Sequence, residues 1–257
     1  MLLTELTDGA REDAQLRERE LSLEAVRDLA TNAPAPLPVL DFLAPSDRIK
    51  VIAEVKRASP SRGDMAEIAD PAALATVYQD AGASVISVLT EGRRFKGSLD
   101  DLRAVRAAVK IPVLRKDFVS TEYQVFEARA AGADLVLLIV AALDDETLAR
   151  LFQLIHSLGM TALVEAHSAE EVTRAVALGA KLIGVNARDL NTFELDRDLF
   201  GSLVGAIPAG TVRIAESAVR TAEDVAHYRA AGADAVLVGE ALVTSNPALT
   251  LASFLEI

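Results

Sequence analysis

Cysteine is absent from this chain, and the absence excludes several chemistries at once. Without a thiol the protein can form no disulfide, no thiolate nucleophile and no thiolate metal site, which fits a reducing compartment. Positive charge is also in short supply, because 26 Lys and Arg face 38 Asp and Glu and give a formal net charge of -12. Binding to nucleic-acid backbones depends on clustered Lys and Arg, so we expect no nucleic-acid partner.

The sequence also lacks a long hydrophobic run. The longest one, Leu135 to Leu143, is too short to span a bilayer. The N-terminal segment carries acidic residues early and has no apolar signal core. We therefore expect a cytoplasmic protein with no membrane partner. The histidines, His156, His167 and His227, have no ligand-like spacing, so no metal site is expected; His156 and His227 fall in predicted helices as surface or packing residues.

Two nucleotide-binding signatures are missing as well: no G-x-G-x-x-G follows the first predicted strand, and there is no P-loop. The chain instead shows a periodic pattern of short apolar runs, each followed by an amphipathic stretch. Eight runs recur about every 26 residues, as alternating strands and helices require. They are Val51 to Lys56, Val85 to Leu89, Pro112 to Phe118, Leu135 to Val140, Thr161 to Glu165, Leu182 to Asn186, Val212 to Ser217 and Ala235 to Gly239. This predicts a closed parallel (β/α)8 barrel of the TIM type, with an open doubly wound sheet as the rival.

The first 48 residues differ from the rest. Leu2, Leu3 and Leu6 can share one helix face, Ser22 is placed to cap a helix from Leu23 to Ala30, and the APAPLP segment should be extended. We interpret residues 1–48 as a helical extension packed on a barrel of residues 49–257, within a single domain. Ala-Gly-Ala or Leu-Gly-Ala triplets end four later helices, at Gly82, Gly132, Gly179 and Gly232.

The first strand carries two charges where an apolar strand should have none. Because side chains alternate along a strand, Ile52, Glu54 and Lys56 point to one face while Val51, Ala53 and Val55 point to the other. Burying an unpaired charge is expensive, so this pattern indicates either chemistry or a buried ion pair. In a barrel, inward residues at the C-terminal strand ends face the active-site mouth, which accounts for both charges.

Polar residues end five of the eight runs and should therefore converge. They are Glu54 and Lys56, Lys116 and Asp117, Glu165, Asn186 followed by Arg188, and Glu216 with Ser217. The fourth run ends in Ile139 and Val140, which could form an apolar wall. Lysine occurs only six times, yet two of the six end strands, where burial or a nearby cation could lower the pKa of the amine for proton transfer. The structural alternative is that Lys56 simply pairs with Glu54 or Glu165.

The loops at the same end offer binding groups. The loop from Arg57 to Asp64 is expected to act as a lid, and Phe95 lies in a basic loop suited to covering a ring-bearing anion. Loops after the last two strands of many barrels bind phosphate through backbone N–H groups, a use that fits Gly239. Glu240 fits only through its N–H, since its carboxylate would repel phosphate.

These strand-end segments, taken together, resemble those of indole-3-glycerol-phosphate synthase of the tryptophan pathway. The matching segments are AEVKRASPSRG (53–63), SVLTEGRRFKGS (87–98), LRKDF (114–118), LVEAH (163–167), IGVNARDL (183–190), IAES (214–217) and LVGEAL (237–242). The likeness runs over nearly the whole chain, and the set of motifs in this order is highly specific.

The resemblance implies a barrel that converts 1-(2-carboxyphenylamino)-1-deoxyribulose 5-phosphate to indole-3-glycerol phosphate, CO2 and water, with no metal or organic cofactor. It implies that Lys116 is the general acid of ring closure and that Glu54, Lys56 and Glu165 carry the proton transfers of dehydration, in an order left open. Asn186 would orient the substrate hydroxyls, with Glu216 and Ser217 supporting it. The implied substrate-binding residues are Ser59, Phe95, Phe118, Arg188, Ala218, Leu237, Gly239 and Glu240.

One residue departs from the family pattern: Ala218 stands where the family usually has glycine after the Glu-Ser pair. If its φ is positive, we expect weaker phosphate binding. The expected binding partner is the phosphorylated substrate, and we expect the protein to be a monomer. Whether another enzyme of the pathway docks on the barrel is left open.

Three other functions are weighed against the sequence. A Schiff-base aldolase would also use a strand-end lysine among carboxylates. The sister isomerase of the pathway resembles a Cys-and-Asp mechanism, which a chain without cysteine cannot perform. A binding-only barrel would have no need of the five groups Glu54, Lys56, Lys116, Glu165 and Asn186 together.

Overall fold

Eight parallel strands close into a barrel in the computed structural model of this protein, which describes residues 2–189 and 192–257. Around the barrel the strand order is β1-β10-β9-β8-β7-β6-β5-β4. The strands are β1 (Lys50–Val55), β4 (Val85–Leu89), β5 (Val113–Lys116), β6 (Leu135–Ile139), β7 (Thr161–Ala166), β8 (Leu182–Asn186), β9 (Val212–Glu216) and β10 (Ala235–Val238). The predicted (β/α)8 barrel is confirmed, and the open doubly wound sheet is wrong.

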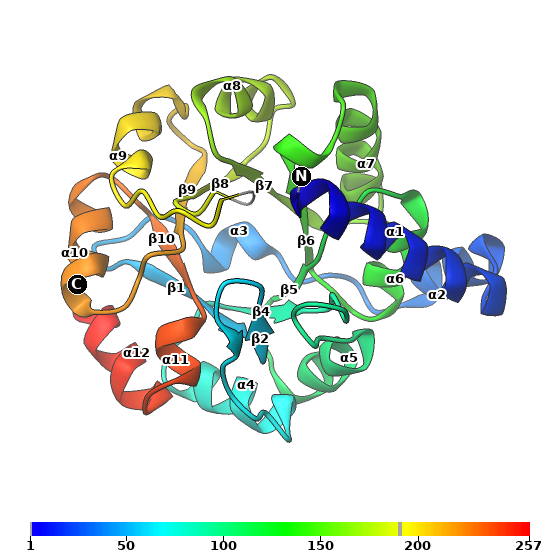
Figure 1. Cartoon of the computed structure of the whole chain (residues 1–257), viewed down its shortest axis with the longest axis horizontal. Coiled ribbons are helices and arrows are strands. Elements are labelled where there is room, and N and C mark those ends of the chain that lie inside the picture. The colour runs from blue at the N-terminus through cyan, green and yellow to red at the C-terminus, as the bar shows by residue number, and fades with distance from the viewer. Residues whose placement is uncertain (1, 190–191) are drawn as a thin grey trace.

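Helices surround the barrel and alternate with its strands (Figure 1). They are α4 (Pro71–Asp80), α5 (Leu99–Ala108), α6 (Glu122–Ala130), α7 (Asp145–Ser157), α8 (Ala169–Ala177), α9 (Leu199–Leu203), α10 (Ala222–Ala230), α11 (Glu240–Val243) and α12 (Pro247–Leu255), with short 3-10 turns at Val140–Ala142 and Val204–Ala206. His156 and His227 lie in α7 and α10, as expected. Among the described helices, none combines the length and apolar character needed to cross a membrane.

Each predicted run coincides with a barrel strand, and the differences lie at the ends. The third run was predicted to reach Phe118, but β5 ends at Lys116 because the Asp117 carboxylate accepts the backbone N–H of Phe118 at 2.8 Å. A short antiparallel hairpin of β2 (Ala58–Ser59) and β3 (Gly63–Asp64), which the sequence pattern did not predict, lies in the lid loop. The four helix-ending glycines all have φ between 78° and 101°, as predicted.

The core has two layers. Ile52 packs inside the barrel with Leu114 and Leu163, whereas Val51 and Val55 pack between the strands and the helices. The alternation predicted for the first strand is therefore confirmed, and Glu54 shares the inward face with Ile52.

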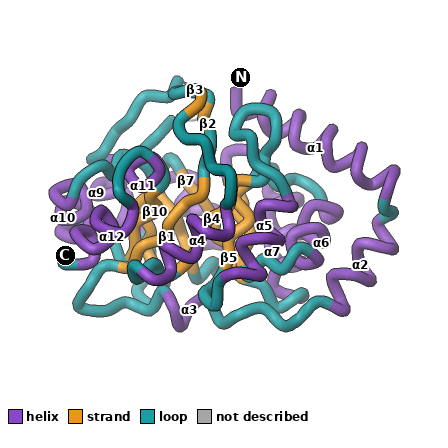
Figure 2. The backbone as a smooth tube through the Cα atoms, turned by 90° about the horizontal axis from the view of Figure 1, so that it is seen from below, coloured by secondary structure: helices purple, strands orange, loops and turns teal. Residues whose placement is uncertain are grey.

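The N-terminal segment forms α1 (Leu2–Glu20), α2 (Leu23–Asn32) and α3 (Val39–Phe42). Ser22 caps α2 as predicted, accepting the N–H of Ala25. Seen from the side, the β2–β3 hairpin and the N-terminal end of α1 lie on one side of the barrel and α3 on the opposite side (Figure 2). There Val39 and Leu43 pack against the inner barrel residues. The N-terminal segment thus contacts both ends of the barrel.

A buried arginine ties β5 to the helices outside it. The guanidinium of Arg115, fully buried, contacts Asp117 at 2.9 Å and Glu127 of α6 at 3.4 Å and donates to the carbonyl of Gln124 at 2.6 Å. Glu127 in turn pairs with Arg17 of α1. Since the next residue, Lys116, points inward, this network fixes the strand that presents it.

Replacing Arg115 with leucine leaves the buried Asp117 carboxylate without its cation and leaves Glu127 with Arg17 alone. We expect Arg115→Leu to lower the free energy of unfolding by about 3 kcal/mol, as for other buried pairs that lose one partner. Arg103→Leu is the matched control, because Arg103 pairs with Asp100 on the surface and its loss should change stability by less than about 0.5 kcal/mol. Urea unfolding of both variants measures the difference, and equal losses would contradict the assignment.

Candidate active site

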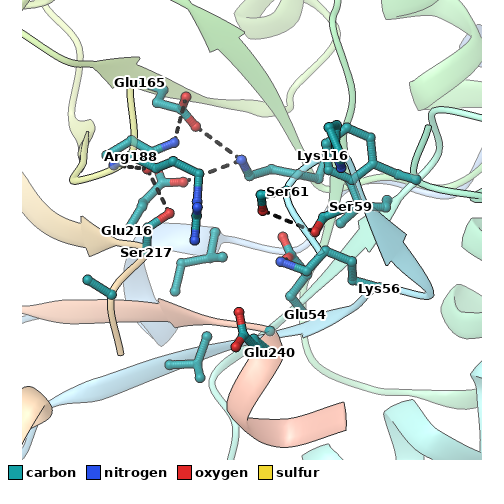
Figure 3. Close-up of a pocket in the computed structure, with 18 of the residues that line it drawn as sticks. Glu54, Lys56, Ser59, Ser61, Lys116, Glu165, Arg188, Glu216, Ser217 and Glu240 are labelled. Carbon is teal, nitrogen blue, oxygen red and sulfur yellow. Dashed lines mark hydrogen bonds and ion pairs between the residues drawn. The ribbon is translucent and has the colours of Figure 1, made fainter. Parts of the chain in front are cut away.

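All fifteen residues that the sequence singled out as catalytic or substrate-binding line one pocket at the C-terminal mouth of the barrel (Figure 3). They are Glu54, Lys56, Ser59, Phe95, Phe118, Lys116, Glu165, Asn186, Arg188, Glu216, Ser217, Ala218, Leu237, Gly239 and Glu240. The fold therefore brings together all of the residues that the sequence predicted to converge.

The charged groups at the base of the pocket come from alternate barrel strands. Glu54, Lys116, Glu165 and Glu216 belong to β1, β5, β7 and β9, and side chains from alternate strands fill one layer of such a barrel. The Lys116 Nζ lies 3.0 Å from Oε2 of Glu165 and 3.4 Å from Oε2 of Glu216 (Figure 3). Both glutamates are almost fully buried. One ammonium thus separates two carboxyl groups that would otherwise repel each other.

Their protonation states follow from this packing. Burial alone would lower the pKa of Lys116, but the attraction of Glu165, Glu216 and Glu54 outweighs it and the pKa is raised. Burial would likewise raise the pKa of Glu165, yet Lys116 and neighbouring groups hold it well below its usual range. Burial and the repulsion of Glu165 raise the pKa of Glu216 to about 8. A lowered pKa, which the sequence left possible for a strand-end lysine, is not found at Lys116, because its neighbours are anions rather than cations.

Glu54 and Lys56 form an ion pair with 2.9 Å between Oε1 and Nζ. The hydroxyl of Ser87, inside the barrel on β4, donates to Glu54 at 3.3 Å. A side chain at Gly239 would collide with the Glu54 carboxylate and crowd Lys56. The ion pair weighed as the structural alternative therefore exists, and it opens onto the pocket.

Asn186 connects the charged layer to the pocket rim. Its amide nitrogen donates to Glu165 at 3.2 Å, while its oxygen accepts the Ser217 hydroxyl at 2.8 Å and the backbone N–H of Arg188 at 3.0 Å. Asn186 is therefore held in one orientation by three partners, as a residue that orients a substrate should be.

One wall of the pocket is apolar. The rings of Phe95 and Phe118 lie 6.0 Å apart between centroids, and Ile139 joins them as predicted. Val140 does not, because it packs toward the helices. Sequence reasoning missed Leu6, which α1 brings to this wall from far along the chain.

The loop that carries Phe95 is held by Glu91, another residue that the motifs did not single out for a role. Its carboxylate accepts the backbone N–H groups of Arg93, Arg94 and Phe95 at 2.8 to 2.9 Å. Ion pairs of Arg93 and Arg94 with acidic residues of α1 join the loop to that helix. Loop and helix therefore build the apolar wall together.

The predicted lid covers the mouth with Ser59, Pro60 and Ser61. It is held on one side by Asp64, 2.5 Å from Nζ of Lys96, and on the other by an ion pair between Arg62 and Glu240. The carboxylate of Glu240 is thus engaged with the lid.

The backbone after β9 is strained. Ser217 and Ala218 have φ of 70° and 55°, in the left-handed region that favours glycine. Ala218 therefore has the positive φ for which the sequence analysis expected weaker phosphate binding.

Gly184 of β8 is the residue that sequence reasoning had most reason to notice, since glycine inside a strand often marks a close approach. A Cβ at this position would overlap with Oε1 of Glu216. The missing side chain provides the space that the Glu216 carboxyl occupies.

Comparison with known proteins agrees with this geometry. The family model described as indole-3-glycerol phosphate synthase matches residues 3–252. The chain is 67% identical to the indole-3-glycerol phosphate synthase of Leifsonia xyli over 98% of its own length and 97% of the relative's. The chain belongs to the indole-3-glycerol phosphate synthase family. The synthases of Mycobacteroides abscessus and Beutenbergia cavernae are 59% and 57% identical, with 95% and 96% of this chain covered and 90% and 92% of theirs.

Two solved structures outside the indole-3-glycerol phosphate synthase family share the fold. An N-acetylmannosamine-6-phosphate 2-epimerase from Clostridium perfringens has a TM-score of 0.59 and 18% identity, covering 76% of this chain and 87% of that one. A thiamine phosphate pyrophosphorylase from Pyrococcus furiosus has a TM-score of 0.60 and 13% identity, covering 80% and 93%. Of the segments that carry the family resemblance, residue Leu190 lies outside the described residues.

Adding a methyl group at position 184 tests whether the space beside Glu216 matters. We expect Gly184→Ala to fold and to lose at least about tenfold in kcat, because Glu216 is predicted to be catalytic and a small misplacement of a catalytic group has effects of that size or larger. Gly205→Ala is the control, since nothing lies within 4 Å of a Cβ there. Circular dichroism checks the fold and steady-state kinetics the loss; full activity in Gly184→Ala would refute the role.

Restoring glycine at position 218 should relieve the left-handed strain. We expect Ala218→Gly to stabilise the protein by about 1 kcal/mol and to raise Tm by about 2–4 °C. If Ala218 lies in the phosphate site, as the family resemblance implies, KM should fall or stay the same, because the backbone can then approach the phosphate more closely. Thermal unfolding and initial rates measure both effects, and a clear rise in KM would count against this position in the phosphate site.

Proposed function

We propose that this enzyme is an indole-3-glycerol-phosphate synthase, a carboxy-lyase of tryptophan biosynthesis that acts through the fifteen pocket residues. It converts 1-(2-carboxyphenylamino)-1-deoxyribulose 5-phosphate to indole-3-glycerol phosphate, CO2 and water. The observation that carries the assignment of roles is Lys116, held protonated between Glu165 and Glu216 at the base of a pocket with one aromatic wall.

Ring closure comes first. The anthranilate ring lies against Phe95 and Phe118, and its carboxyl-bearing carbon attacks the ribulose carbonyl. The carbonyl oxygen takes a proton from Lys116, whose raised pKa keeps the amine charged until the alkoxide forms. The carboxylate then leaves as CO2, and the electrons of its bond restore the aromatic ring.

Dehydration follows. The hydroxyl formed from the carbonyl leaves as water and needs a proton, which the Lys56–Glu54 pair at the mouth can supply. A proton bound to carbon must then be lost to form the indole, and Glu165, the carboxylate with the lowered pKa, is the base for it. Glu216, protonated up to about pH 8, limits the negative charge beside that base.

The other end of the substrate is an anion. We assign the phosphate to the rim formed by Arg188, the backbone of Ala218 and Gly239, with Ser59 of the lid above and Leu237 beneath. Asn186, fixed by three hydrogen bonds, orients the hydroxyls between the two ends, and Ser217 fixes Asn186. We further propose a monomer working in the cytoplasm without metal or organic cofactor.

The aldolase alternative is weakened by the same lysine. Imine formation requires a neutral amine as nucleophile. The buried Glu165 carboxylate, 3.0 Å from Nζ, favours the ammonium form of Lys116 instead. The pocket therefore supports proton donation by Lys116 over nucleophilic attack.

A direct assay tests the function. We expect the purified enzyme, with a chelator present, to convert 1-(2-carboxyphenylamino)-1-deoxyribulose 5-phosphate with the appearance of indole fluorescence. Lys116→Ala should lose at least about a hundredfold in kcat, the usual contribution of a general acid. Lys110→Ala, which replaces an exposed lysine outside the pocket, should keep full activity. Absence of turnover in the folded wild type would overturn the function, and loss of turnover on chelation alone would overturn the metal-free mechanism.

A further inference from the structure

His167 follows β7 two residues after Glu165, and its side chain is only 14% exposed. Nε2 lies 3.3 Å from Oε1 of Glu165, and Nδ1 lies 3.3 Å from Oε2 of Glu171 in the first turn of α8. The ring does not line the reaction pocket; it lines a second cavity that shares Asn186 with that pocket. None of the assigned roles uses this histidine.

The two contacts define the state of the ring. A neutral imidazole carries one N–H, so it can offer a proton to one carboxylate and must turn a lone pair toward the other. Glu171 is an anion here, because its Oε2 also accepts the backbone N–H of His167 at 2.8 Å and its pKa is lowered. Glu165 is an anion because of Lys116. Nε2 makes no hydrogen bond at its 3.3 Å distance from Glu165, so that contact is electrostatic. The imidazolium is the form of the ring that two neighbouring anions favour.

The surroundings of the ring agree with a positive charge. Asp189, Glu194 and Asp196, from the segment after β8, line the second cavity together with His167. Burial alone would lower the pKa of the imidazole, but the contacts with Glu165 and Glu171 raise it to about 10.

The charge acts on Glu165. Lys116 of β5 approaches Oε2 of that carboxylate, while the amide of Asn186 from β8 and the ring of His167 approach Oε1. Glu216 of β9 faces the same group with the opposite effect, and Glu54 of β1 acts on the cluster through Lys116 and Glu216. Each oxygen of Glu165 thus has a cation of its own.

We propose that His167 is a positioning residue for the reaction: as an imidazolium held by Glu171, it keeps Glu165 ionised and fixes the direction of its carboxylate. This deepens the proposed function and rests on it where activity is the readout. The protonation of the ring can be measured without substrate.

The first experiment is 15N NMR of the enzyme labelled at histidine. The His167 signals are those lost in His167→Gln or, should that variant fail to fold, those that remain in His156→Gln and His227→Gln. We expect both ring nitrogens to be protonated from about pH 6 to pH 9, beyond the range of an ordinary histidine. A neutral tautomer at neutral pH would overturn the proposal, whatever the activity.

The second experiment is the pH dependence of kcat/KM for His167→Gln, whose amide can still donate a hydrogen bond but carries no charge. Without the cation, Glu165 should bind a proton at higher pH, so the acid limb of the profile should move up by about one unit. We expect kcat to fall about tenfold because the Glu165 carboxylate loses its fixed direction, and KM to stay nearly unchanged because His167 does not line the pocket.

Two variants complete this test. Glu171→Gln should move the acid limb in the same direction by a smaller amount, because it weakens the imidazolium without removing the ring. His156→Gln, on the exposed face of α7, should leave the profile unchanged. An acid limb that stays in place in His167→Gln would show that the residue only packs. Absence of turnover in the wild type would count against the proposed function alone, because the NMR measurement still decides the charge of the ring.

Discussion

The structure depends on one buried ammonium. Glu165 and Glu216 lie in the same layer of a closed barrel, where water cannot screen them, and two carboxyl groups so placed do not both ionise readily. Lys116 stabilises the anionic form of Glu165, and the negative charge of Glu165 together with burial favours the protonated form of Glu216. A cluster that would destabilise the fold elsewhere thereby places a proton donor and a carboxylate at the base of the pocket, as the proposed mechanism requires.

Much of the surrounding architecture keeps this cluster in place. Arg115 fixes the strand of Lys116 from the helix side, and Gly184 leaves space for Glu216 on the inner side. Farther out, ion pairs join α1, the Phe95 loop and the lid, so the walls of the pocket are assembled from segments that are distant in sequence. Packing keeps the base of the site fixed, while surface charges hold the groups that cover it.

The sequence predicted the barrel and the strand-end polar residues of the site because both depend on local regularities, whereas Ser59, Phe118, Ala218 and Leu237 followed only from the family resemblance. Alternation in β1 placed Glu54 inward, and strand ends must meet once a parallel barrel closes, so Asn186 and Ser217 could be placed before any coordinates. Leu6 could not, since nothing local says that α1 reaches the mouth. The direction of the Lys116 pKa shift could not be predicted either, because it depends on side chains that become neighbours only when the barrel closes. The two carboxylate partners of His167 become visible only in three dimensions.

Gly184 has a consequence for anyone who would redesign this barrel. The depth of the mouth at the Glu216 carboxyl is set by a residue that contributes only a hydrogen atom there. Transferring the charged side chains to another barrel would therefore not reproduce the site. The position equivalent to Gly184 must also be a glycine, so that the Glu216 carboxyl has space. In this fold the geometry of the site depends on an absent side chain as well as on those that are present.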